Sequence, residues 1–139
     1  MKQLLIVVAM LLTLPAFSQI EEEYESQTFG WVDSEIYTKA LSQMIRLDSL
    51  VADEVLVTYL KPSGERNKYL TKQSLRTYLI KNFYSPKEKV FKFLSEANHG
   101  YVLVYGQFGK DPDVAVRFWT IFIEQTTGKI VVIEIEENR

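Results

Sequence analysis

The last third of the chain is the region that most constrains the fold. Four segments rich in β-branched and aromatic residues follow one another there, and this composition predicts strands: 88–96, 101–108, 114–125 and 130–137. Turn residues separate them, as at 98–100 and 127–129. Connections this short join antiparallel strands, because a parallel pair needs a long crossover. The sequence therefore predicts a four-stranded antiparallel meander.

A helix is predicted over residues 33–52, well before the meander. Apolar side chains recur there at every third or fourth position, as on one face of a helix: Ile36, Ala40, Met44, Leu47 and Val51. Asp33 or Ser34 would cap the first turn by accepting from its free N–H groups. Alternatively, Asp48 marks a break, after which a second short helix would carry Leu50 and Val51.

A short hairpin and a second helix are predicted next. Residues 54–60 form a strand, 62–64 a turn and 66–70 the returning strand, with Pro62 and Gly64 as turn residues. Thr71 would cap a helix over 72–83. The buried face of this helix would carry three apolar residues: Leu75, Leu79 and Phe83.

Gly106 interrupts the second strand of the predicted meander. A glycine inside a strand marks a bulge or a sharp bend. We therefore expect the sheet to curve here around the helices.

The first residues have the pattern of a cleavable secretory signal peptide, 1–18. Lys2 precedes an apolar run over 4–14, Pro15 follows, and Ala16 and Ser18 are small residues at −3 and −1 of a cleavage site. The run is too short to span a membrane. Residues 19–32 are predicted to form a solvated arm, and 33–139 a single domain.

The residue content excludes several classes of function. The chain has no cysteine and one histidine, which excludes thiol chemistry, a lipid anchor on cysteine and cysteine-based metal sites. Its formal net charge of −2 gives no basic face for nucleic acid. We expect no metal, no cofactor and no stable membrane anchor, and a soluble protein that is exported to the periplasm or secreted.

The order of elements resembles the nuclear transport factor 2-like superfamily, a cystatin-like α+β cone. The residues that carry the resemblance lie in six segments: 55–57, 64, 69–79, 105–108, 117–121 and 127–131. Phe83, Phe91-x-Phe93, His99-Gly100 and Tyr105-x-x-Phe108 are also similar to exported bacterial domains of unknown function in that superfamily. The resemblance implies an α+β fold in which N-terminal helices pack on a curved antiparallel sheet.

Five residues are candidates for ligand binding: Tyr59, His99, Tyr105, Arg117 and Trp119. Arg117 and Trp119 alternate along one strand, so they share a face. On the concave face they would line a pocket or pack structurally; on the other face Arg117 would stack on Trp119 at the surface. His99 is a natural general base, with Glu96 the nearest carboxylate in sequence.

The acidic residues of the predicted sheet are interpreted as a solvated face and a protected edge. They are Glu124, Glu134, Glu136 and Glu137.

Three functions fit these observations. The first is an exported, non-catalytic domain that binds a small ligand in the cone or a protein partner through its sheet. The alternative is an enzyme of the same superfamily, an isomerase, dehydratase or hydrolase. The resemblance implies this because enzymes of that superfamily place Asp, His or Tyr inside the cone. The third is a homodimer through the sheet face that carries Tyr101, Tyr105 or Trp119.

Overall fold

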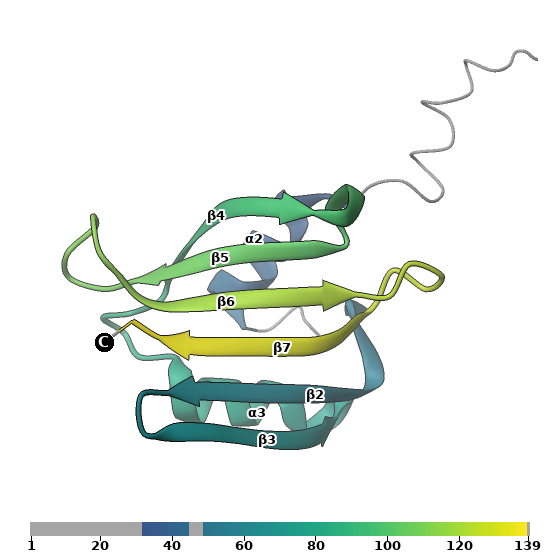
Figure 1. The fold of residues 1–139 in the computed structure, drawn as a ribbon, viewed down its shortest axis with the longest axis horizontal. Coiled ribbons are helices and arrows are strands. Elements are labelled where there is room, and N and C mark those ends of the chain that lie inside the picture. The colour runs from purple at the N-terminus through teal and green to yellow at the C-terminus, as the bar shows by residue number, and fades with distance from the viewer. Residues whose placement is uncertain (1–31, 45–48, 139) are drawn as a thin grey trace, which may run out of the picture. The chain divides into compact units, whose positions relative to one another are not determined.

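A single six-stranded sheet, in the order β3-β2-β7-β6-β5-β4, organises the residues that the structure describes (Figure 1). The structure is a computed structural model and describes residues 32–44 and 49–138. The predicted signal peptide, the predicted arm up to Trp31, and Leu47 and Asp48 lie outside these residues. The strands are β2 (Val51–Lys61), β3 (Gly64–Thr71), β4 (Val90–Ala97), β5 (Val102–Phe108), β6 (Ala115–Ile123) and β7 (Ile130–Glu137).

The strand directions agree with the predicted meander and hairpin. Strands β4 to β7 pair consecutively and antiparallel, and β2 and β3 form an antiparallel hairpin. The prediction of an entirely antiparallel sheet is wrong at one place, because β2 pairs with β7 in parallel. Turn lengths fix only the direction of consecutive strands, and these two strands are separated in the sequence by residues 62–129. The result is an α+β fold built on one mixed, curved sheet.

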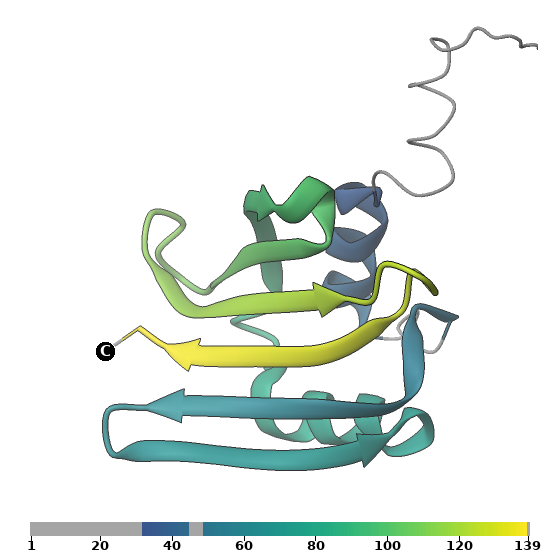
Figure 2. The ribbon, with the colours of Figure 1, turned by 45° about the vertical axis from the view of Figure 1, so that its right-hand side comes forward.

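Two helices cover one face of this sheet, as Figures 1 and 2 show. Helix α3 (Lys72–Phe83) confirms the prediction for 72–83, with its cap Thr71 accepting from the Ser74 amide and its three predicted apolar residues buried. A single 3₁₀ turn, η3 (Asn98–Gly100), connects β4 to β5. None of the helices in the described part of the chain is long and apolar enough to span a membrane.

Helix α2 (Ser34–Gln43) is shorter than the predicted 33–52. Asp33 caps it, as expected, but Met44 takes a left-handed conformation at its end, and Val51 already belongs to β2. The apolar spacing that predicted one helix over 33–52 therefore includes residues of both a helix, α2, and a strand, β2. Ile36 is also 50% exposed, whereas Tyr37 is buried and donates to the Gly128 carbonyl at 3.0 Å. This contact fixes which side of the helix faces the sheet.

Gly106 confirms the expected irregularity on β5. The register shifts between Gln107 and Phe108 on this strand, and between Phe93 and Ser95 on its neighbour β4. A Cβ at position 106 would lie 2.7 Å from the Phe108 ring. A larger residue at position 106 would therefore force the Phe108 ring to move.

Candidate functional site

Polar side chains gather on the helix-covered face of the sheet, which we call the inner face. Arg117 on β6 lies directly opposite Glu137 on β7 and Gln107 on β5. Tyr59 on β2 and Glu88, between α3 and β4, complete the group. We name these five residues the Arg117 cluster. The alternation along β6 thus places Arg117 and Trp119 on the concave side, one of the two predicted alternatives.

Arg117 binds two carboxylates. Its Nε donates to Glu137 Oε2 at 2.6 Å, and its Nη1 donates to Glu88 Oε1 at 2.9 Å. The side chains of Arg117 and Glu137 are only 14% and 11% exposed. The guanidinium carbon lies 5.6 Å from the centre of the Phe83 ring. Removing one partner of an ion pair this shielded from water is costly, because it leaves an unpaired buried charge, although forming the pair also has a desolvation cost.

Gln107 connects this ion pair to the aromatic core. It is 0% exposed, and its Oε1 accepts from Trp119 Nε1 at 2.9 Å and from Arg117 Nη1 at 3.4 Å. Its Nε2 donates to the carbonyls of Phe83, at 2.7 Å, and of Glu88. A buried amide needs partners of this kind to offset its desolvation. Gln107 therefore ties the end of α3 and the following loop to the sheet.

Two groups of the cluster, the Tyr59 hydroxyl and the Arg117 guanidinium, are stabilised in their ordinary charge states. Burial raises the pKa of Tyr59, and so does the hydrogen bond from its hydroxyl to Glu137 Oε2, at 2.5 Å. Burial lowers the pKa of Arg117, but the bonds to Glu137 and Glu88 outweigh this and hold the pKa above its usual value. A neutral tyrosine and a charged arginine are thus both favoured, so neither is poised to exchange protons near neutral pH.

The structure brings together three of the five predicted ligand-binding residues. Tyr59, Arg117 and Trp119 meet through Glu137 and Gln107. These two linking residues were missed: Glu137 was interpreted as a solvated edge residue, which is wrong, and no interpretation included Gln107. Aligning β5, β6 and β7 in their pairing register places both residues opposite Arg117, and this alignment is the signal that could have identified them.

The other two predicted residues point elsewhere. Tyr105 pairs with Trp119 across the strands, but its hydroxyl donates to the Ser34 carbonyl on α2 at 3.0 Å. Burial raises its pKa to about 12. His99 is exposed in the η3 turn, at the opposite end of the strands from Arg117, with a left-handed φ of 57°.

Two expectations about the aromatic residues are corrected. The guanidinium of Arg117 stacks on Phe83 inside the domain, not on Trp119 at the surface. Tyr101, Tyr105 and Trp119 are 7%, 0% and 0% exposed, so the face that carries them is covered and is not open to a second copy.

Side chains fill the inner face around the cluster. Seven large residues there are at most 1% exposed and pack against the protein on all sides: Leu75, Leu79, Leu103, Tyr105, Trp119, Ile133 and Ile135. Phe83 and Phe91 meet the Trp119 ring edge-on, with centroids 5.9 and 5.2 Å away. The cluster is therefore a largely buried polar layer at one end of a packed core, with Glu88 at its partly exposed side.

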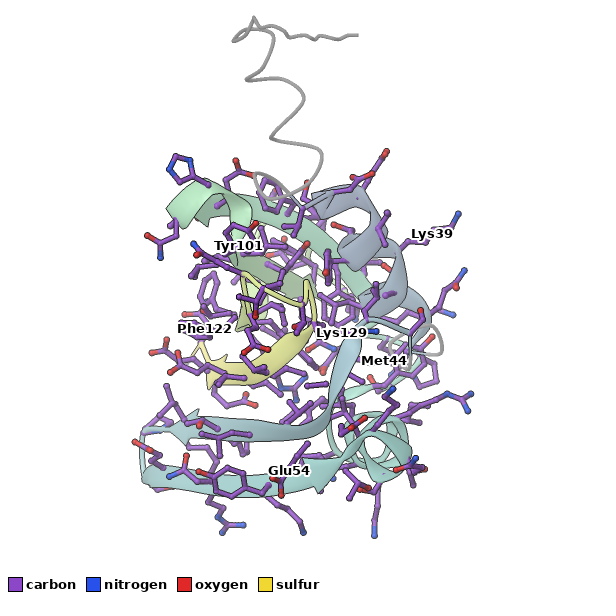
Figure 3. The ribbon with its side chains drawn as sticks, turned by 90° about the vertical axis from the view of Figure 1, so that its right-hand side faces the viewer. Lys39, Met44, Glu54, Tyr101, Phe122 and Lys129 are labelled. Carbon is purple, nitrogen blue, oxygen red and sulfur yellow. The ribbon has the colours of Figure 1, made fainter. Side chains whose placement is uncertain are left out.

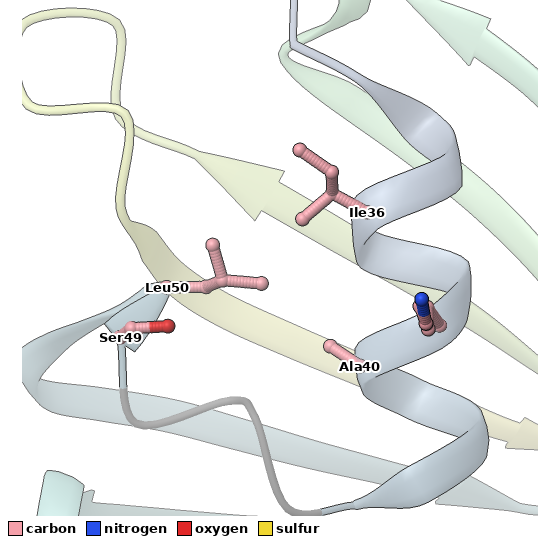
Figure 4. Close-up of a pocket in the computed structure, with 5 residues that line it drawn as sticks. Ile36, Ala40, Ser49 and Leu50 are labelled. Atoms are coloured by element: carbon pink, nitrogen blue, oxygen red, sulfur yellow. The ribbon is translucent and has the colours of Figure 1, made fainter.

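A shallow hollow of about 250 Å³ lies beside α2 (Figure 4). Ile36 and Ala40 of the helix face Ser49 and Leu50, which precede β2, and Lys39 also lines it. These side chains offer one charged group and no acid–base pair. Among the described residues no group of three or more histidine, cysteine or acidic side chains could hold a metal ion.

The opposite face of the sheet, the outer face, has no described element over it (Figures 1 and 3). Register places five apolar side chains in one line across five strands of this face. We call this line the apolar row: Tyr69, Leu56, Val132, Phe122 and Val102. Tyr69 is 68% exposed, and the other four are partly exposed.

Comparisons with known proteins support the fold. No protein-family model matches the sequence, and no curated protein matches it. A DUF4783 family protein from Bacteroides ovatus has a similar structure, with a TM-score of 0.61 and 13% identity over 78% of this chain and 96% of that one. An NTF2-like protein of unknown function from Mesorhizobium loti gives 0.57 and 13%, over 76% and 88%.

A candidate ketosteroid isomerase from Kribbella flavida is similar at a TM-score of 0.50 and 12% identity, over 76% of this chain and 75% of that one. At these identities the likeness establishes the fold alone. The chain has the NTF2-like α+β fold. In this it is similar to bacterial domains of unknown function, as the sequence resemblance implied.

Proposed function

We propose that this chain is an exported, non-catalytic domain that binds a protein partner through the outer face of its sheet. The apolar row is the observation that carries the proposal. It lines up partly exposed apolar side chains from five adjacent strands on a face with no described element over it. Large contiguous apolar patches on a soluble domain are typical of interaction sites.

The packing of the inner face supports a surface contact over a small-molecule site. Trp119 and Tyr105, which would line a pocket in the cone, are 0% exposed and surrounded by protein. A ligand would have to displace this core, and such a rearrangement costs more than most small molecules gain on binding.

The positions of the candidate acid–base residues favour binding over an enzyme. Catalysis needs a base, an acid and a reacting atom within hydrogen-bond reach of one another. His99 lies at the opposite end of the strands from Tyr59 and Arg117, and both of these are bonded to Glu137.

Export rests on the signal-peptide pattern of residues 1–18. Expression in a bacterial host tests it by fractionation and mass measurement. We expect an exported product that begins at or near Gln19, whereas an intact chain in the cytoplasm would contradict export.

Photocrosslinking in the native host tests the outer face. Phe122 on the apolar row is replaced by photoreactive benzoylphenylalanine, and Ile36 on α2 receives the same group as the matched exposed control. We expect protein adducts from position 122 and few or none from position 36. Equal labelling at both positions, or none at 122, would refute the proposed contact.

A further inference from the structure

We infer that a patch of cations at the end of the β2–β3 hairpin binds the surface of an anionic phospholipid membrane. We call it the basic patch, and it has four members: Lys61, Arg66, Lys68 and Lys81. This surface is separate from the outer face and adds a second contact to the proposed function. The choice of a lipid as the partner rests on the proposed export.

The charges of this chain are unevenly distributed along the sequence. Residues 61–81 carry six basic side chains and one acidic side chain, whereas the whole chain has 16 basic and 18 acidic residues. This stretch forms the end of β2, all of β3 and most of α3, and β3 is an edge strand of the sheet. The formal net charge of −2 therefore conceals a local excess of positive charge at this edge.

Three members of the basic patch project from the inner side of the hairpin. Arg66 on β3 lies directly opposite Tyr59 on β2. Lys61 and Lys68 are each two positions away from one of these residues along their strands, so alternation places them on the same side. Lys61 Nζ lies 5.7 Å from the centre of the Tyr59 ring, and Lys68 Nζ lies 5.4 Å from the centre of the Tyr78 ring on α3. The hairpin thus presents its cations together, beside two tyrosine rings.

The last turn of α3 supplies the fourth cation, Lys81. Lys81 follows Tyr78 by three positions, so the two side chains are neighbours on the helix surface. Phe83, at the end of α3, meets the Tyr59 ring edge-on with centroids 4.9 Å apart. The end of the helix and the end of the hairpin therefore lie side by side, as Figure 1 also shows.

The charges of the basic patch are available to a partner. All four side chains are exposed, and no carboxylate of the described residues lies within ion-pairing distance of any of them. The other two basic residues of 61–81 have partners within the domain. Lys72 lies 3.9 Å from Asp53, and Arg76 Nε donates to the Met44 carbonyl at 2.9 Å.

Two carboxylates near the hairpin leave the patch positive. Glu65 is next to Arg66 on β3, so alternation places it on the outer side, where it accepts from Asn67 at 3.0 Å. Glu137 is only 11% exposed and is already paired with Arg117. The field that the patch presents to solvent is therefore set by its cations.

An anionic membrane surface fits this arrangement of side chains. Clusters of about four or more lysines and arginines are typical of surfaces that bind anionic lipids. Tyrosine is enriched at the headgroup level of membranes, where its ring meets the apolar boundary, and Tyr59 and Tyr78 are both partly exposed. Export would bring the chain to the outer surface of a membrane and away from the nucleic acid of the cell.

The contact should be reversible and oriented. Acidic residues predominate in the rest of the chain, and they include Glu134 and Glu136 on the outer face. An anionic surface repels these groups, so the basic patch is the part of the described domain that can face it. The outer face then stays accessible to the proposed protein partner.

Flotation of residues 19–139 with lipid vesicles tests the inference. Residues 1–18 are omitted because their apolar run would itself enter a membrane, and every described residue is kept. We expect the protein to float with vesicles that contain phosphatidylglycerol and to stay behind with vesicles of phosphatidylcholine alone. Binding should fall at least about tenfold between about 0.01 M and 0.5 M salt, because salt screens the attraction.

Two charge-reversal variants locate the contact. Arg66→Glu with Lys68→Glu should weaken vesicle binding at least about tenfold, because each change removes an attractive charge and adds a repulsive one. Lys39→Glu with Lys129→Glu is the matched control. It changes the net charge by the same amount, but on α2 and in the turn between β6 and β7 (Figure 3), so it should lose far less binding. Circular dichroism checks that both variants are folded, and equal losses in the two would overturn the inference.

Other results also decide against a lipid partner. A wild type that does not float with phosphatidylglycerol vesicles at low salt overturns the inference. Retention on immobilised heparin without flotation overturns it too, because the partner would then be a soluble polyanion. Fractionation measures export separately, so a cytoplasmic chain that binds vesicles through the basic patch would support the patch and contradict export alone.

Discussion

The two faces of the same strands have opposite roles. On the inner face, Trp119, Tyr105 and Ile133 are 0% exposed. On the outer face of the same strands, Phe118, Val104 and Glu134 are partly exposed. The comparison shows that aromatic content alone does not mark a binding site, because this chain places aromatic residues on both faces. Whether an element covers the face decides what they do.

Polar groups show the same contrast. The Arg117 cluster satisfies its hydrogen bonds inside the protein, whereas Glu65 and Lys92 sit at exposed sheet edges. In the sequence, a charged residue next to aromatic residues, such as Arg117, resembles a ligand site. In the structure, Arg117 instead joins the sheet to α3 and to the loop that follows α3.

The largest expected effect comes from deleting the central inner aromatic residue. Trp119→Ala should lower the free energy of unfolding by about 3–5 kcal/mol, because it removes buried area and leaves a cavity. The outer-face control Phe122→Ala should cost less than about 1 kcal/mol in the monomer. Chemical denaturation at low protein concentration measures both values, and equal losses would contradict the division between the faces.

A smaller loss of folding stability is expected from removing the positive charge of Arg117. Arg117→Met should cost about 3 kcal/mol at neutral pH, because it leaves Glu137 shielded from water without its cation. Adding Glu137→Gln should recover part of this loss. Denaturation curves of the single and double variants measure the coupling, and strictly additive losses would show that the two side chains do not stabilise each other.

The smallest effect concerns one hydroxyl and the pH. Tyr105→Phe should cost about 1 kcal/mol at neutral pH, because the bond to the Ser34 carbonyl is lost. The fold raises the pKa of Tyr105 from 10.0 to about 12, so it favours the neutral form. Its stabilising contribution is therefore complete below pH 10 and is lost as the pH rises through about 12.

Alkaline denaturation followed by circular dichroism measures this loss. Tyr105→Phe should lose less stability than the wild type as the pH rises through this window. The exposed outer-face control Tyr69→Phe should follow the wild type. A Tyr105→Phe variant with unchanged alkaline sensitivity would contradict the role of the buried hydroxyl.

Local signals in the sequence predicted most of the elements. The cap at Thr71 and the spacing of Leu75, Leu79 and Phe83 gave helix α3 its bounds, and the content of β-branched residues between turns gave β7. Apolar spacing extended the first predicted helix too far. Val51 fits the helical spacing that begins at Ile36, but it is the first residue of strand β2. The parallel pairing of β2 and β7 had no local signal, since it depends on contacts between distant segments.

The candidate site was predicted only in part, for a related reason. Alternation placed Arg117 and Trp119 on one face, but their partners depend on the register of three strands. Gln107 and Glu137 align with Arg117 only when β5, β6 and β7 are paired as observed. Glu88 lies in a loop, whose position no periodicity describes. The apolar row likewise exists only once five strands are aligned.

The place of β7 has a consequence for how this chain folds. The strand lies between β2 and β6 and, among the strands that the structure describes, it alone joins the β2–β3 hairpin to the β4–β6 segment. The sheet therefore cannot be completed until residues 130–137 are available, and pairing segments so distant in sequence slows folding. A chain whose last strand closes its sheet stays incompletely folded during synthesis. That delay would suit the export that we propose for this chain, because an exported chain crosses the membrane before it folds.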